Sequence, residues 1–488
     1  MKFKDTPLIQ ALLRYQGENY RPLHMPGHKQ GNSQPDWFKE LLGPQVFKFD
    51  LTELPGLDDL HNPVGVISEA QQAAARCFGA EESFFLVNGS TVGLQAMIMA
   101  AARTEAELLI PRQAHRSVLG GLILAGVRPR YLPVEIEKDF QIPLGTPNGA
   151  VEKVLREVQQ VNGLLIVHPN YYGITSDLGG LVRVAKSSGL ICLADEAHGP
   201  HFRFHEQLPI TALEAGVDAT TQSLHKVLSS LTQTALLHRQ GQRLPAERLK
   251  KALNLLQSTS PSYILMASLE AACWQMENEG RELLERTLEL AAEARQQINQ
   301  IQGLRCLGEE VKKYHSVSEW DQTKLIINVH GLGLTGVQAA HILREDYGIQ
   351  VEMADSANIL AMVTIGDRPE AVQDLVRACR ELAVRWYGQL GWPKQTKPAL
   401  YLDTDPEVVL TPREAFFWSQ RRTLRLREAE GEIAGETICP YPPGIPLLAP
   451  GERITRPVIE TIEEWRTMGI TWQGPTDPTL TTIQVLEV

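Results

Sequence analysis

Short apolar runs alternate with longer amphipathic segments over the first half of the chain. The runs SFFLV, ELLIP, RPRYLPV, GLLIVHP and LICLADEA are strand-like, and segments of helical character near residues 69–78, 115–126, 149–161 and 180–188, and after NGST, separate them. VDATTQSL and TQTALLHR add two more strand-like runs. Strands that alternate with helices predict βαβ units around a mainly parallel sheet, which is an α/β fold.

The pattern changes after residue 245. The stretch from Ile264 to about Gln302 is rich in Leu, Ala and Glu and can hold two helices, one of them long. KLIINV and NILAMVT, each followed by a helical segment, predict a smaller α/β domain.

Proline and glycine mark the two ends. Residues 1–65 contain RPLHMPGHKQG and FDLTELPGLDDLHNPVG, whose turn chemistry indicates an ordered arm. WPKQTKPAL is a plausible linker, and the prolines of CPYPPGIPLLAPGE exclude a helix there. We therefore expect an arm at 1–65, a large domain at 66–300, a small α/β domain at 301–395 and a C-terminal domain at 396–488.

Composition narrows the class of protein. The 488 residues carry a net charge of −11, so binding to nucleic-acid phosphates is not expected. The six cysteines show no CxxC or metal-ligand spacing, which predicts buried reduced thiols and no metal site. No apolar run approaches the roughly 20 residues needed to span a bilayer, and the N-terminus lacks a signal-peptide core. We expect a cytoplasmic protein without a membrane partner.

Three polar motifs follow strand-like runs. Asp195 ends LICLAD, Ser90 and Thr91 begin a helix after FFLVNG, and Lys226 stands between two strands among several hydroxyls. Taken singly, these are also what a surface turn, an ordinary helix cap and a solvated lysine look like. Together they supply the parts that hold pyridoxal 5′-phosphate (PLP): a carboxylate for the ring nitrogen, a helix N-terminus for the phosphate and an amine for the Schiff base.

Seven motifs in one order extend this picture. The chain contains LHMPGHKQG, DLTELPGLDDLHNPVG, VNGSTVG, PRQAHRSV, ADEAHGPH, QSLHKVLSS and CPYPPGIPLLAPGE. In these it closely resembles the Orn/Lys/Arg decarboxylase family, whose large domain has the aspartate-aminotransferase fold (PLP fold type I). The resemblance runs from about residue 23 to 452.

The resemblance implies a role for each matching residue. Lys226 would form the Schiff base, Asp195 would pair with the pyridine nitrogen, and His198 would lie close to cofactor and substrate. Ala197 would pack on one face of the ring and His115 would stack on the other. The phosphate would be bound by Ser90, Thr91 and Ser223, with Gly89 and His225 beside them; His225 or the freed Lys226 would return a proton to the substrate carbon.

The implied reaction is α-decarboxylation of a basic amino acid. Arginine is the first choice from the resemblance, followed by lysine and ornithine, and polyamine biosynthesis is the implied role. Glu432 and Glu436 could bind the distal cation or could be surface acids. Transamination, aldol cleavage and a non-catalytic scaffold remain alternatives. The sequence resembles the short form of the family, which lacks the N-terminal wing domain of the large inducible members, so we expect a homodimer and leave a higher assembly open.

Overall fold

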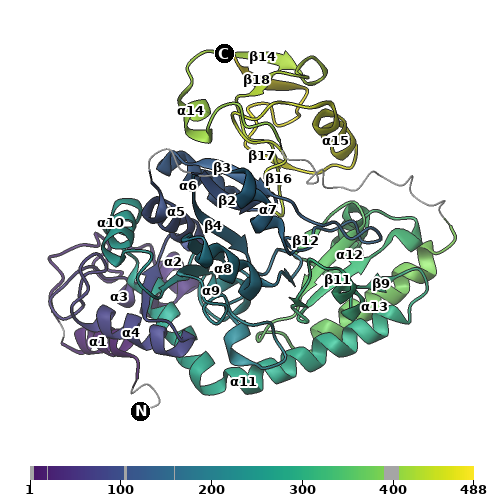
Figure 1. Ribbon diagram of the computed structural model, residues 1–488. Helices are drawn as coiled ribbons and strands as arrows, with labels where there is room; N and C mark the ends of the chain where they lie inside the picture. Colours follow the sequence, from purple (N-terminus) through teal and green to yellow (C-terminus); the bar gives the residue numbers. More distant parts are fainter. Residues whose placement is uncertain (1–4, 19, 104–106, 159, 390–405) are drawn as a thin grey trace.

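The computed structural model describes residues 5–18, 20–103, 107–158, 160–389 and 406–488 (Figure 1). Its centre is a seven-stranded sheet in which only β8 runs antiparallel to its neighbours. In spatial order the strands are β1 (Glu82–Leu86), β8 (Ala235–Arg239), β7 (Ala219–Gln222), β6 (Ile191–Asp195), β4 (Val161–Val167), β2 (Glu107–Pro111) and β3 (Arg128–Leu132). The predicted α/β class with a mainly parallel sheet is confirmed.

Helices cover both faces of this sheet. They are α4 (Val66–Phe78), α5 (Gly89–Ala101), α6 (Arg116–Ala125), α7 (Ala150–Glu157), α8 (Leu178–Ser187), α9 (Leu224–Val227) and α10 (Ala246–Leu256). Because side chains alternate along a strand, β6 sends Leu193 into the core under α5, α6 and α10, and Cys192 and Ala194 into the core under α7 and α8. The sheet is therefore buried on both sides, as its continuous apolar strands require.

Two helix predictions were wrong in length. The helix expected near 149–161 ends at Glu157, because Val158 is already extended and β4 begins at Val161. The stretch expected to hold two helices is the single 37-residue helix α11 (Tyr263–Asn299). No proline interrupts α11, and its one glycine, Gly280, is packed closely by Phe204, so the chain continues without a break. Figure 1 shows α11 running beneath the large domain to the small one.

The small domain has an antiparallel sheet in the order β12-β13-β11-β9. Its elements are β9 (Arg305–Cys306), β11 (Lys324–Asn328), α12 (Gly336–Tyr347), β12 (Met353–Ala354), β13 (Asn358–Met362) and α13 (Pro369–Trp386). The two-stranded pairing of β5 (Ile174–Thr175) with β10 (Glu319–Trp320) joins it to the large domain. Short 3-10 helices are η1 (Phe202–Phe204), η2 (Glu309–Lys313), η3 (His330–Leu332) and η4 (Leu426–Glu428).

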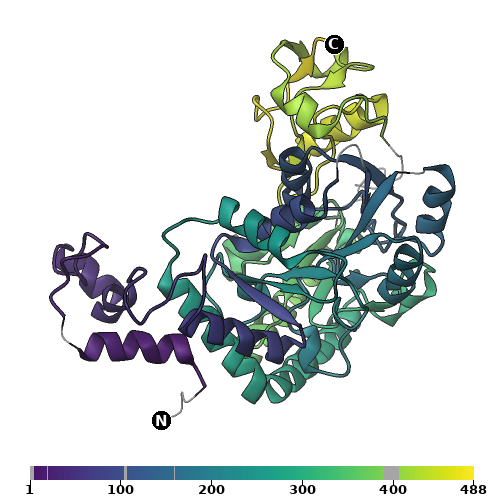
Figure 2. The same cartoon turned by 60° about the vertical axis from the view of Figure 1, so that its left-hand side comes forward.

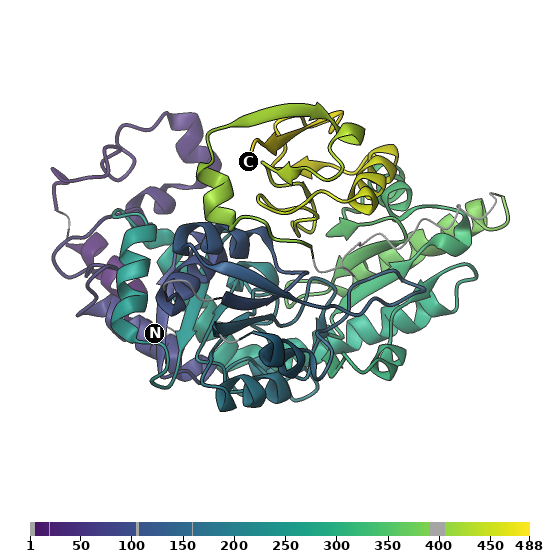
Figure 3. The same ribbon diagram turned by 45° about the horizontal axis from the view of Figure 1, so that its top comes forward.

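The C-terminal domain has its own core and is seated on the side of the large domain that carries α6 (Figure 3). It consists of α14 (Pro412–Phe417), β14 (Arg421–Arg425), β15 (Ile433–Ala434), β16 (Cys439–Pro440), α15 (Arg456–Thr467), β17 (Trp472–Gln473) and β18 (Thr482–Leu486). Residues 441–449 form turns and extended chain, as their prolines predicted. Arg112 of the large domain makes a buried two-pronged ion pair with Glu452, at 2.7 and 3.0 Å. The predicted linker WPKQTKPAL lies outside the described residues.

The N-terminal arm projects from the body of the molecule (Figure 2). Its turn-rich sequence did not reveal three helices, α1 (Pro7–Gly17), α2 (Asp36–Leu42) and α3 (Pro44–Phe49). Glu270 of α11 holds the start of α1, since its two carboxylate oxygens accept from Leu8 N (3.0 Å) and Ile9 N (2.7 Å). Among the described residues, no helix combines the length and the apolar character that crossing a membrane requires.

Candidate active site

Asp195 lies at the carboxyl end of β6, between β4 and β7. Its side chain is buried, and one carboxylate oxygen accepts a hydrogen bond from Ala197 N at 3.1 Å. Burial raises the pKa of this carboxyl, while the charge of Lys226 and the Ala197 N–H act in the opposite direction. The strand end therefore presents a buried carboxylate with room for a second donor, as a pyridine nitrogen would be.

Lys226 lies on the short helix α9, between β7 and β8. Its Nζ is 3.0 Å from Nε2 of His198, so two motifs predicted separately meet in space. Burial lowers the pKa of the Lys226 amine, and the carboxylates of Asp195 and Glu352 only partly oppose this effect. An amine with a lowered pKa is easier to obtain in the neutral, nucleophilic form that Schiff-base chemistry needs.

The predicted phosphate-binding hydroxyls also converge. Ser90, in the first turn of α5, lies with its Oγ 2.7 Å from Oγ of Ser223, the residue that precedes α9. The side chain of Asn88 does not cap α5, and Gly89 has a φ of +73° that only glycine adopts without strain. A helix N-terminus without a side-chain cap, flanked by two buried hydroxyls and the exposed Thr91, has the chemistry of a phosphate site.

His115 and His225 flank this cluster. His115 caps α6 by accepting from Ser117 N, which is the role that its sequence position alone suggests. Burial and then the charge of Lys226 lower its pKa to about 4, so its ring is neutral at physiological pH. Nδ1 of His225 lies 2.8 Å from the carbonyl of Thr234, which leaves Nε2 for other partners. Ring stacking by His115 and proton delivery by His225 stay predictions.

Glu432 and Glu436 are engaged within the C-terminal domain. Glu432 pairs with Arg422 at 2.8 Å. The two carboxylate oxygens of Glu436 accept from Thr476 N (2.7 Å) and Gln484 N (2.9 Å). Neither contact joins these side chains to Asp195, His198 and Lys226, which are called the lysine cluster below. The geometry therefore gives no support to the predicted binding of a substrate cation.

Three residues that the sequence did not single out complete the cluster. Lys324, the first residue of β11, is buried, and its Nζ lies 3.2 Å from Nδ1 of His198. The ring of Tyr171 lies 4.7 Å from the ring of His198, and its hydroxyl donates to Glu352. Lys324 begins an apolar run and Glu352 stands in a loop before β12, so neither had a recognisable motif.

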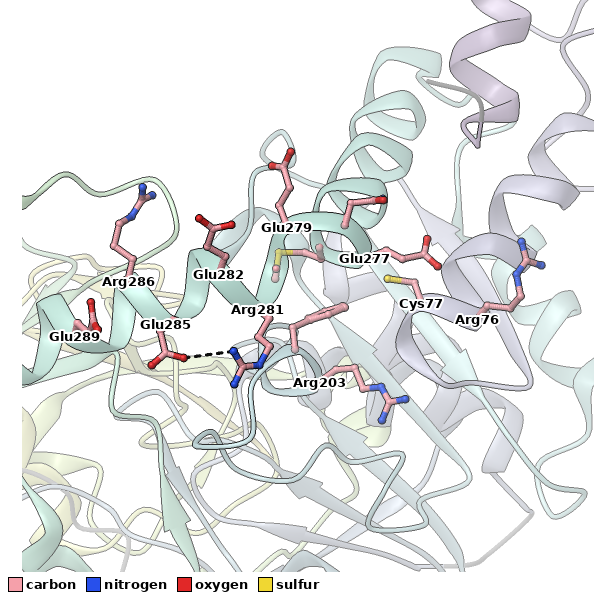
Figure 4. Close-up of a pocket in the computed structure, with 14 residues that line it drawn as sticks. Arg76, Cys77, Arg203, Glu277, Glu279, Arg281, Glu282, Glu285, Arg286 and Glu289 are labelled. Carbon is pink, nitrogen blue, oxygen red and sulfur yellow. Dashed lines mark ion pairs between the residues drawn. The ribbon is translucent and has the colours of Figure 1, made fainter. Parts of the chain in front are cut away.

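Two cavities differ in character. One of about 270 Å³ opens between β12 and the proline-rich segment 440–447, and Glu352 and Tyr441 are among its lining residues. The other, of about 760 Å³, lies where the end of α4 and η1 meet α11, and it shares no residue with the lysine cluster (Figure 4). Two of its arginines are paired with acids, Arg203 with Glu214 at 2.8 Å and Arg281 with Glu206 at 2.6 Å. Only the first cavity borders the cluster.

Comparisons with known proteins agree with this geometry. The models of the Orn/Lys/Arg decarboxylase major domain and C-terminal domain match residues 6–371 and 394–471. An arginine decarboxylase of Bacillus anthracis is 37% identical over 99% of this chain and 97% of its own length. The structure of the constitutive lysine decarboxylase of Escherichia coli superposes with a TM-score of 0.83 at 22% identity, over 99% of this chain and 82% of that one.

The fold class extends further. An alanine–glyoxylate aminotransferase of Nostoc superposes with a TM-score of 0.53 at 16% identity, over 70% of this chain and 92% of that one. The predicted aminotransferase-like fold is thereby confirmed, and the family expectation drawn from the seven motifs is confirmed by the matched models. The chain belongs to the Orn/Lys/Arg decarboxylase family.

Proposed function

We propose that this protein is a PLP-dependent α-decarboxylase that acts on a basic amino acid, with arginine, converted to agmatine, as the preferred substrate. The observation that carries the proposal is the convergence of Asp195, His198 and Lys226 beside the Ser90–Ser223 pair. The family to which the chain belongs is PLP-dependent. Relatives at 37% identity that bear the name arginine decarboxylase support arginine over lysine.

The residues present fit this cofactor. Asp195 has an oxygen available for a protonated ring nitrogen. The first turn of α5, with Ser90 and Ser223, would bind the phosphate. Lys226 has the amine that would bond to the aldehyde carbon. When bound, PLP supplies an electron sink for the pair of electrons left when CO2 departs.

Lys226 has the properties of a group that moves a proton. Burial lowers the pKa of its amine, which brings the neutral form within easier reach, so Nζ can alternate between the two forms: it can accept a proton and give it back to the substrate carbon. Burial of Lys226, beside the neutral ring of His115, limits the access of water to this nitrogen. Excluding water protects a developing carbanion from unwanted protonation.

Glu352 is the best-placed acid for the cationic end of the substrate. Tyr171 joins it to the cluster, with its ring against His198 and its hydroxyl on the Glu352 carboxylate. Glu352 also borders the cavity beside segment 440–447, whose remaining walls are largely apolar. A carboxylate at the end of an apolar passage suits a long side chain that ends in a guanidinium.

The substrate experiment is a parallel incubation of the PLP-loaded protein with arginine, lysine and ornithine, with CO2 and the product amine quantified. We expect agmatine from arginine at the highest kcat/KM. Formation of a keto acid instead of CO2 would reassign the protein to transamination. A protein that stays colourless after addition of PLP, or a Lys226→Ala variant that keeps the visible absorption band, would rule out the proposed cofactor chemistry.

Glu352→Gln tests the assigned acid. Loss of a charge-assisted hydrogen bond, worth about 1.5–3 kcal/mol, predicts an increase in KM for arginine of roughly 10- to 100-fold, with the visible band retained. Glu345→Gln, an exposed acid of α12, is the matched control and should leave KM unchanged. An unchanged KM in Glu352→Gln would remove Glu352 from substrate binding.

A cytoplasmic homodimer acting in polyamine biosynthesis is part of the same proposal. The arm carries large apolar side chains that are exposed in one chain, and a second copy would cover them. They include Leu23 (94% exposed), Met25, Trp37, Leu41 and Val64 (82% exposed). Light scattering coupled to gel filtration should give twice the chain mass, and Leu23→Ser with Trp37→Ser should shift the equilibrium toward one chain; a monomeric wild type would contradict the proposal.

A further inference from the structure

A second lysine belongs to the candidate catalytic cluster. Lys324 is 1% exposed, although lysine is among the residues least often buried. Its Nζ donates to the carbonyl of Tyr171 at 2.7 Å and lies 3.2 Å from Nδ1 of His198. On the opposite side of the imidazole, Nε2 of His198 is 3.0 Å from Nζ of Lys226. The histidine is therefore held between two lysines, one on each ring nitrogen.

The contacts of Lys324 constrain the proton on this histidine. An ammonium group has donors and no acceptor, so beside a charged Lys324 the Nδ1 atom must accept. A neutral imidazole carries one proton, which then resides on Nε2. Burial is the largest cause that places the pKa of His198 well below its ordinary value, so the ring is neutral.

Several charged groups face Lys324. Asp321, from the turn before β11, is buried and lies 3.1 Å from His201; its carboxylate favours the charged lysine. Glu352 acts in the same direction, and Lys226 acts against it. Burial is the largest influence and lowers the pKa of Lys324 to about 8, so the amine is mostly protonated at neutral pH and loses its proton in mildly alkaline solution.

We propose that Lys324 is a positioning residue that fixes His198 as the Nε2–H tautomer and directs that N–H toward Lys226. A neutral Lys226 amine has a lone pair that accepts from Nε2–H, so this tautomer stabilises the nucleophilic form of the amine. With the opposite tautomer, Nε2 would accept and would stabilise the ammonium form. Lys324 thus acts on the reacting amine through His198 and does not itself touch it.

The direct test reads the tautomer of His198 by 15N solid-state NMR of histidine-labelled protein, with His198→Gln to assign its signals. In the wild type at pH 7 we expect an unprotonated Nδ1 and a protonated Nε2. Lys324→Arg, which keeps a charged donor, should preserve this pattern, and Lys324→Met should produce a mixture or the opposite tautomer. A protonated Nδ1 in the wild type, or an unchanged pattern in Lys324→Met, would overturn the proposal.

A pH series of the wild type provides a test that needs no variant to fold. The tautomer signal should change as Lys324 loses its charge near pH 8, and a signal that is constant from pH 6.5 to 9.5 would contradict the proposal. This readout requires neither cofactor nor turnover. Failure of the tautomer test is therefore distinguishable from failure of the proposed decarboxylase activity, on which the kinetic consequence alone rests.

The kinetic consequence is a loss in kcat. Misplacement of a reacting group costs roughly 100-fold, so we expect Lys324→Met to lower kcat by about that factor with KM within a few fold of the wild type. Lys324→Arg should recover most of the rate. Lys312→Met, which removes an exposed lysine of the same domain paired with Glu319, is the matched control and should keep the wild-type rate. A Lys324→Met enzyme with an unchanged kcat would argue against the role.

Discussion

The ion pair between Arg112 and Glu452 should control how firmly the C-terminal domain is attached. Arg112 Nη1 and Nη2 reach the two carboxylate oxygens of Glu452 at 2.7 and 3.0 Å, and Nη2 also donates to the Leu447 carbonyl at 2.8 Å. The side chains are 6% and 2% exposed. Glu452→Gln leaves a buried guanidinium without its counter-charge, and breaking such a pair from one side costs about 3–5 kcal/mol.

This cost is a large penalty for the attachment of the C-terminal domain to the large domain. It corresponds to a change of roughly two to three and a half orders of magnitude in the equilibrium for detachment. Hydrogen–deuterium exchange should be faster in segment 440–452 and in α6, where the C-terminal domain contacts it. The central strands β4 and β6 should keep their protection. Thermal unfolding followed by tryptophan fluorescence should show an earlier first transition.

Two further variants decide whether the reasoning is right. Replacing both partners with apolar residues, Arg112→Met with Glu452→Leu, should cost much less than the sum of the single changes, because no buried charge is left unpaired. Glu407→Gln breaks an exposed ion pair with Arg453 within the C-terminal domain, next to Glu452 in sequence, and should have little effect. A Glu452→Gln variant as stable as Glu407→Gln, or strict additivity in the double variant, would refute the buried-pair argument.

Two other predictions concern pH and cofactor affinity. Burial lowers the pKa of His168 to about 4 and of His238 to about 3, from about 6.5 in the unfolded chain, so the unfolded state binds more protons below pH 6.5. The stability that the two neutral histidines contribute is fully present above pH 6.5 and falls toward pH 4. At pH 5 each histidine should lower the free energy of unfolding by about 2 kcal/mol. Urea titrations at pH 7.5 and pH 5 measure this loss, and His238→Gln should reduce the difference between the two unfolding free energies. Ser90→Ala and Ser223→Ala should each weaken PLP binding by roughly tenfold, measured by absorbance titration; unchanged affinity in both would exclude them from the phosphate site.

The parts of the site that sequence could predict are those fixed by local order along the chain. Asp195 ends an apolar strand, Ser90 begins a helix after a strand, and Lys226 lies between two strands. In a parallel sheet these positions meet at one edge because the carboxyl ends of the strands lie side by side. The sequence pattern alone therefore located them, without knowledge of how the domains pack.

The parts that it could not predict depend on contacts between domains. Lys324 begins KLIINV, a run that indicates a buried strand and says nothing about which side chain its first residue will meet. It reaches His198 only because the small domain packs against the end of β6. Glu436 shows a related limit, since the sequence left open whether it binds substrate or is a surface acid, and only the structure shows that its carboxylate accepts from two backbone amides of its own domain.

Helix α11 has a mechanical consequence. Near its start, Tyr263, Met266 and Leu269 belong to the core shared with the arm, and near its end Ala291 and Ile298 belong to the core of the small domain. The continuous helix α11 is thus packed into two hydrophobic cores. A rotation of the small domain, which would carry Lys324 away from His198, must bend α11 or displace its first turns relative to the arm. A displacement of the arm and a displacement of the catalytic cluster are therefore mechanically coupled through α11.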